Sequence, residues 1–97
     1  MILGQFDIHP DDVSTAAELM LVMMNETIKE QGCHQYAYSR DLSNPNRFQL
    51  SELWEDGEAL AAHFRADHMA TYRAGMGKLR VQSRTVKRYE VTSAGDP

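Results

Sequence analysis

At 97 residues, with 42% apolar and 25% charged residues, the chain has the composition of one small folded domain and is too short for two. Fourteen acidic residues against ten basic ones give a net charge of −4, which argues against nucleic acid as the main partner. Residues 1–60 hold eleven acidic and three basic residues, whereas residues 61–97 hold three acidic and seven basic ones. These opposite charges favour attraction within or between subunits.

The first two predicted elements are a strand and a helix. Residues 2–9 alternate between two faces, which is the period of a strand. Pro10 and the acidic pair Asp11 and Asp12 indicate the start of a helix of about 20 residues by helical periodicity. Its apolar stripe includes several methionines, which we interpret as core residues, and Gly32 is expected to end it.

The rest of the chain predicts a hairpin, a second helical segment and a last strand. Strand-forming residues at 33–42 and 47–54 flank a run of turn residues, Ser43-Asn44-Pro45-Asn46. Asp56 can cap a second helix, and Asp67 can cap it again after a break, before Gly75 and Gly77 end the segment. Residues 79–91 alternate again.

The order of elements is therefore β-α-β-β-α-β, which predicts an α+β fold with a four-stranded antiparallel sheet and both helices on one face. We assign residues 1–92 to a single domain and residues 93–97 to a flexible C-terminal tail. The uncovered face of the sheet predicts a homodimer that packs sheet against sheet.

Glu52 is the first candidate for chemistry. The third strand places it on one face with Phe48, Leu50 and Trp54, so a carboxylate lies in an otherwise apolar row. It is either an acid or base or a structural anchor that meets a backbone group or an arginine. The hairpin register, which decides whether tyrosines or their neighbours face this row, is left open by the sequence.

His63 is the second candidate. It shares a helical face with Leu60, Phe64 and Asp67, so it is predicted to border a cavity and to be oriented by the Asp67 carboxylate one turn later. Such an imidazole can act as a general base. The alternative is a half-buried structural histidine, with His68 on the surface.

A metal site is not expected. His63 and His68 are five positions apart, which separates their directions by about 140° on a continuous helix. No glycine-rich phosphate loop or nucleophile elbow is present, so no nucleotide cofactor is indicated. Arg80, Arg84 and Arg88 share one face of the last strand, where a solvated or dimer-bridging role is expected.

Cys33 is the single cysteine, so no disulfide within the chain is possible and a cytoplasmic location is expected. No basic leader with an apolar stretch and no run of about 20 apolar residues is present, so export and membrane association are not expected.

Three groups of residues resemble the antibiotic biosynthesis monooxygenase family, and most closely its small quinol-monooxygenase-like members. They span nearly the whole chain in the order and spacing typical of the family. They are Glu30-Gln31-Gly32-Cys33-His34-Gln35-Tyr36, the Glu52-Leu53-Trp54 element within residues 44–56, and Ala59-Leu60-Ala61-Ala62-His63 followed by His68.

The resemblance implies a ferredoxin-like subunit in a dimeric α/β barrel, with a pocket between the helices and the sheet. Members oxidise quinol- or anthrone-type aromatic substrates with O₂ and need no metal, flavin or haem, so no cofactor is expected. The implied roles are His63 as base, Glu52 as anchor or auxiliary acid, and Trp54 and Tyr36 as an aromatic wall. Two further roles do not come from the family motifs: Asp67 is expected to orient His63, and Tyr72 is expected to act as a phenol donor. Phe64 and His68 are expected to bind the substrate.

Three alternatives remain open at this stage. Haem-degrading relatives carry a tryptophan and a haem-ligating histidine where this chain has His63 and Arg73, which disfavours haem. An isomerase-type relative that acts on small phosphorylated molecules is the other enzymatic alternative. The non-enzymatic alternative is a stress-related dimer that binds small aromatic molecules without converting them.

Overall fold

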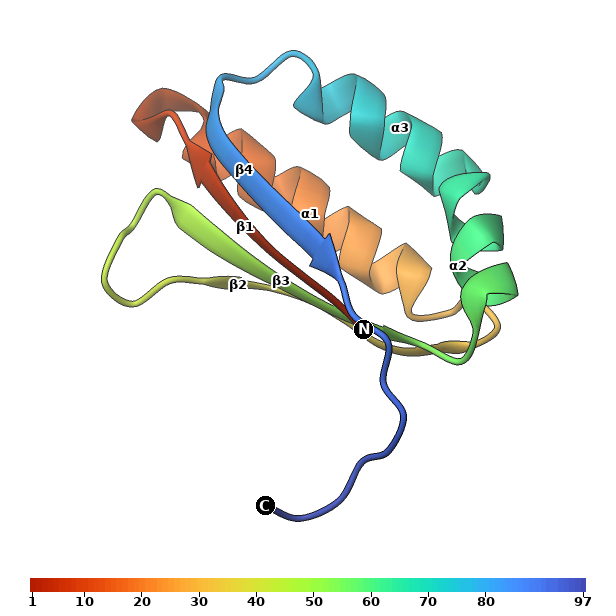
Figure 1. Ribbon diagram of the computed structural model, residues 1–97. Coiled ribbons are helices and arrows are strands. Elements are labelled where there is room, and N and C mark those ends of the chain that lie inside the picture. Colours follow the sequence, from red (N-terminus) through yellow and green to blue (C-terminus); the bar gives the residue numbers. More distant parts are fainter.

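The computed structural model describes residues 1–97, in which three helices cover one face of a four-stranded antiparallel sheet (Figure 1). The sheet order is β2-β3-β1-β4, so the predicted split βαβ arrangement is confirmed. The elements are β1 (Ile2–Ile8), the 3₁₀ turn η1 (Pro10–Asp12), α1 (Val13–Thr27), β2 (Cys33–Arg40), β3 (Arg47–Trp54), α2 (Gly57–Phe64), α3 (Asp67–Met76) and β4 (Val81–Arg88).

The core lies between α1 and the sheet. Alternation along β1 turns Ile2, Phe6 and Ile8 towards the helices, and all three are buried. On the facing side of α1, Met20 and Met23 are each 1% exposed. The interpretation of these methionines as core residues is confirmed, and their flexible side chains suit the irregular space between a helix and a twisted sheet.

The first helix differs from its prediction at both ends. Pro10 starts a 3₁₀ turn rather than the α-helix, which begins at Val13. The helix ends at Thr27, well before Gly32, because residues 28–32 form successive turns that lead into β2. Gly32 has the predicted positive φ, at 82°, but it serves the turn and not the helix end.

The second helical segment is two helices. Asp56 caps α2 as predicted, because its side chain accepts a hydrogen bond from the Ala59 N–H at 2.8 Å. The chain then leaves helical geometry at Ala66, whose ψ is 147°. Asp67 is the first residue of α3 and makes no capping hydrogen bond, so its predicted capping role is wrong.

The structure settles the register of the β2–β3 hairpin, which the sequence left open. Tyr36 pairs with Glu52 and Tyr38 with Leu50, while the register shifts between Cys33 and Gln35. Both tyrosines therefore share the helix-facing side of the sheet with Glu52. The pairing continues without a shift from Tyr36 to Arg40 at the loop, so the loop sets the faces of the two tyrosines, and the bulge changes the register only at Cys33.

The last strand is shorter than the predicted strand of residues 79–91. β4 covers Val81–Arg88, and residues 89–97 form no helix or strand. Arg80 precedes the strand and binds Asp12, with its Nε 3.0 Å from Oδ2, so it is not part of an arginine face on β4. This pair joins the basic and acidic parts of the chain within one subunit, as their charges predicted.

The outer face of the sheet is more polar than the homodimer prediction assumes. Hydrogen bonds from Arg47 to Asp7 and from Gln49 to Gln5 cross this face, although Leu3 is 44% exposed there. The homodimer stays a prediction. None of the helices has the length and apolar character that crossing a membrane requires.

We predict that Gly32→Ala destabilises the fold. An added Cβ would lie 2.7 Å from the Cβ of Ala59, and alanine disfavours a φ of +82°. The expected loss is about 2 kcal/mol, measured by urea unfolding. Gly95→Ala is the control, because nothing lies within 4 Å of the added atom. Equal stability of the two variants would contradict the prediction.

Candidate functional site

A cavity of about 400 Å³ lies between the sheet and the α2–α3 layer. Eleven of its fifteen lining residues are hydrophobic, which suits an apolar or aromatic ligand. The lining residues are Ile2, Phe6, Tyr36, Tyr38, Leu50, Glu52, Phe64, Met69, Tyr72, Arg73, Met76, Gly77, Val81, Arg84 and Val86.

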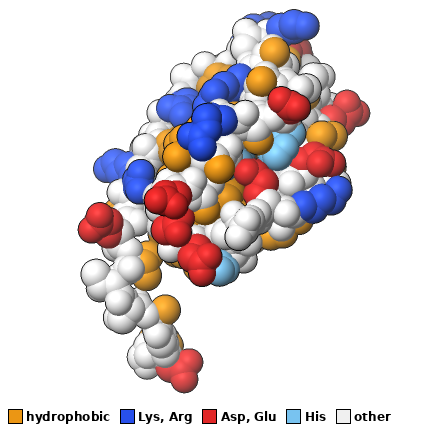
Figure 2. Space-filling view, turned by 90° about the vertical axis from the view of Figure 1, so that its right-hand side faces the viewer, with side chains coloured by type: hydrophobic (Ala, Val, Ile, Leu, Met, Phe, Trp, Pro, Cys, Tyr) orange, Lys and Arg blue, Asp and Glu red, His pale blue; other side chains and the backbone are white.

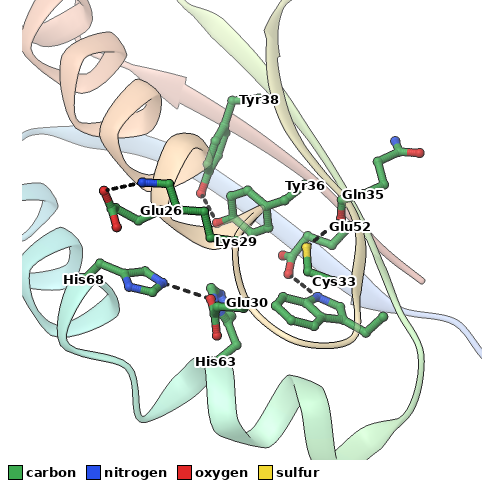
Figure 3. Close-up of polar contacts among 11 residues, drawn as sticks. Glu26, Lys29, Glu30, Cys33, Gln35, Tyr36, Tyr38, Glu52, His63 and His68 are labelled. Atoms are coloured by element: carbon green, nitrogen blue, oxygen red, sulfur yellow. Dashed lines mark hydrogen bonds and ion pairs between the residues drawn. The ribbon is translucent and has the colours of Figure 1, made fainter.

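Glu52 supplies the single carboxylate of this cavity. The residue is 6% exposed, and its Oε1 accepts a hydrogen bond of 2.9 Å from Trp54 Nε1 (Figure 3). Burial raises the pKa of Glu52, because the ionised form loses its water. The hydrogen bond from the indole opposes that rise without cancelling it. A carboxylate in this environment holds a proton more firmly than one in water, which is the property of a general acid or base.

Three phenol groups form a chain along the cavity wall. Tyr36 Oη donates to Tyr38 Oη at 3.4 Å, and the Oη atoms of Tyr38 and Tyr72 are 2.8 Å apart. Burial raises the pKa of all three, so they stay neutral hydrogen-bond donors at neutral pH. When each hydroxyl donates to the next, from Tyr36 through Tyr38, the proton of Tyr72 is left for a ligand.

Two arginines add positive charge to the cavity. The guanidinium carbon of Arg84 lies 5.9 Å from the ring centre of Phe6, and that of Arg73 lies 5.9 Å from the ring centre of Phe64. Pairing of Arg84 with Phe6 across β4 and β1 turns Arg84 towards the helices. Arg84 therefore lines the cavity. The sequence predicted a solvated or dimer-bridging role for this residue and did not predict its place at the cavity.

His63, His68 and Glu30 form a second polar group beside the cavity. Oε2 of Glu30 lies 2.6 Å from Nδ1 of His63 and 2.8 Å from Nε2 of His68 (Figure 3). Glu30 comes from the turn between α1 and β2, His63 from α2 and His68 from α3. The prediction that Asp67 orients His63 is wrong, since the carboxylate on its ring belongs to Glu30.

The ring of His63 is enclosed by aromatic side chains. Its centre lies 4.8 Å from that of Trp54 and 5.5 Å from that of Tyr36, and the residue is 1% exposed. His63 does not line the cavity. It lies behind Tyr36 and beside Trp54, the indole that holds Glu52, so the geometry connects it to the cavity through neighbours.

The structure divides the predicted site residues into two sets. Tyr36, Glu52, Phe64 and Tyr72 line the cavity, whereas His63, His68, Trp54 and Asp67 do not. Glu30 belongs to the family-like stretch of the sequence, but no role was predicted for it, and the cavity-lining role of Arg84 was not predicted either. The position of Glu30 directly before the Gln31-Gly32 turn carries no pattern, but the pairing of Arg84 with Phe6 follows once the register is known.

The family comparison agrees with this architecture. The sequence profile described as antibiotic biosynthesis monooxygenase matches residues 1–75, which is more than half of the chain. The chain belongs to the antibiotic biosynthesis monooxygenase family. The matched region includes Glu30, Glu52, His63, His68 and the three tyrosines, whereas Arg84 and the other cavity residues after position 75 lie outside it. No curated protein sequence matches the chain significantly.

Solved structures confirm the antibiotic biosynthesis monooxygenase fold. A Deinococcus radiodurans protein, provisionally described as such a monooxygenase, superposes with a TM-score of 0.90 at 23% identity and covers 100% of this chain and 98% of its own. A Nitrosomonas europaea protein with the same provisional description gives 0.87 at 20% identity, over 94% and 88% of the two chains. Rv0793 from Mycobacterium tuberculosis gives 0.85 at 25% identity, over 97% and 96%.

We predict that Glu52→Gln stabilises the protein at neutral pH. Glu52 has a pKa in the folded state above its unfolded value, so its ionisation opposes folding once the pH passes that folded pKa. Glutamine avoids this cost and still offers an oxygen to Trp54 Nε1. The gain in melting temperature over wild type should be larger at pH 8 than at pH 4, measured by thermal unfolding. A gain that shrinks as the pH rises would contradict the assignment.

Proposed function

We propose that this protein is a cofactor-independent monooxygenase that oxidises a quinol- or anthrone-type aromatic substrate with O₂. The observation that carries the proposal is the buried Glu52 carboxylate in a cavity whose other walls are apolar, phenolic or basic. Membership of the antibiotic biosynthesis monooxygenase family supports the general reaction class. The size of the cavity, about 400 Å³, suits a substrate of a few fused rings.

The reaction needs a base and a dry site. Removal of a proton from the substrate produces an electron-rich carbanion or phenolate, which gives one electron to O₂. The two radicals combine at the ring carbon to form a peroxide anion, which takes back the proton from the protonated base and becomes a hydroperoxide. Loss of water then leaves a carbonyl, so one oxygen atom enters the product, the other leaves as water, and the substrate supplies both electrons. Apolar walls keep bulk water from solvating the anion.

Glu52 is suited to accept the substrate proton, because it reaches the cavity and its raised pKa brings its basicity closer to that of the substrate. Tyr72 and Arg84 are suited to stabilise the developing negative charge on oxygen. We assign His63 a positioning role through Trp54 and Tyr36, since both rings separate it from a bound substrate.

We further propose a cytoplasmic homodimer that consists of two copies of a 1–92 domain with a free 93–97 tail. Antibiotic biosynthesis monooxygenases are typically dimeric, which supports this assembly. The exposed Leu3 on the outer face of the sheet supports the open face as the contact. Sedimentation of a stable monomer at micromolar concentration would contradict it.

We predict that Glu52→Gln abolishes most of the oxygenase activity. Loss of a general base lowers kcat/KM by roughly 10²–10⁴-fold. The measurement is O₂ uptake with a panel of reduced quinones and anthrones, corrected for their autoxidation in buffer. Glu55→Gln is the matched control, because Glu55 follows the same strand but is exposed, and it should retain wild-type activity.

His63→Ala separates the two possible bases in the same assay. A positioning role predicts a partial loss that is smaller than the loss in Glu52→Gln. A near-complete loss in His63→Ala with an active Glu52→Gln would instead make His63 the base, as the sequence predicted. Absence of uptake above buffer with every substrate would favour a protein that only binds aromatics.

A further inference from the structure

We infer that Glu30, His63 and His68 form a binding site for a divalent transition-metal ion such as Zn²⁺ or Co²⁺. The proposal goes beyond the oxygenase function, which needs no metal. One carboxylate oxygen and two imidazole nitrogens, one from each residue, lie within 4.8 Å of one another. This donor set is typical of zinc and of other borderline divalent ions.

The fold, and not the local sequence, creates this convergence. On a continuous helix the five-residue separation of His63 and His68 would point their rings apart. The break at Ala66 reorients the chain between α2 and α3, so that both rings reach the same oxygen of Glu30. The argument against a metal site therefore does not hold in the structure.

The geometry needs only small adjustments to hold an ion. An ionised carboxylate only accepts hydrogen bonds, so both imidazoles donate a proton to Oε2 of Glu30. In a tetrahedral zinc site the ligands lie about 2.0–2.2 Å from the ion, which separates neighbouring ligand atoms by roughly 3.3 Å. The distances from Glu30 Oε2 to the two ring nitrogens are 2.6 and 2.8 Å, so each must lengthen by several tenths of an ångström while the ion replaces the two shared protons. The two ring nitrogens lie within 4.8 Å of each other and must adopt the same spacing around the ion.

The cluster is reachable from solvent on one side. The side chain of His68 is 21% exposed and that of Glu30 is 16% exposed, whereas that of His63 is 1% exposed. On the corresponding face of the molecule, histidine side chains appear next to acidic ones (Figure 2). An ion can therefore enter beside His68 and keep water as a further ligand, while His63 anchors the inner side.

The experiment is a titration of the full-length, tag-free protein with Co²⁺, followed by its visible absorption bands and by calorimetry, and then by displacement with Zn²⁺. We expect one ion per chain. His68→Ala should weaken binding at least tenfold. His34→Ala should bind like wild type, because it removes an exposed histidine outside the cluster.

Glu30→Gln provides a second variant that keeps both histidines and removes only the charged oxygen. It should also weaken binding at least tenfold, and circular dichroism reports whether each variant is folded. Absence of saturable binding by wild type, or equal affinity in His68→Ala and His34→Ala, would overturn the proposal. The readout is the bound ion itself, so it is independent of any oxygenase activity.

Discussion

The Oε2 atom of Glu30 connects three segments that are distant in the sequence: the α1–β2 turn, α2 and α3. These contacts place the two helices against the turn that precedes β2, and through His63 they support the aromatic rings of Trp54 and Tyr36. Trp54 in turn donates the hydrogen bond that holds Glu52 at the cavity. The orientation of the cavity carboxylate therefore depends on a contact outside the cavity.

Much of the fold was predictable because it follows from local periodicity. Alternation located β1, strand-forming residues beside a turn located β3, and the bounds of β3 agree with the prediction to the residue. The capping role of Asp56 was predictable for the same reason, since a cap acts within one helical turn. The position of Glu52 in an apolar row depended only on its own strand, so that prediction also needed no tertiary information.

The candidate site was less predictable because its contacts are not local. Asp67 has the right helical spacing to reach His63, but that spacing assumes a continuous helix, and the break at Ala66 removes the assumption. Glu30 contacts a residue 33 positions away, and no local pattern encodes such a pair. Arg84 illustrates the same limit, since its place at the cavity depends on the pairing of β4 with β1, the two strands nearest the chain ends.

The cavity itself follows from how α3 packs. Gly75 lies so close to α1 that an added Cβ would be 2.9 Å from Leu19 Cδ2, and Met69 is the only buried residue of α3. The helix therefore rests on α1 more than on the sheet, and in Figure 1 it stands away from β4. A domain of this size has few apolar residues with which to fill the remaining space. The tyrosines that line it instead pair their hydroxyl groups with one another, because a buried phenol without a partner would destabilise the fold. The same arrangement that satisfies these hydroxyls leaves the Tyr72 proton as a donor for a ligand in the cavity.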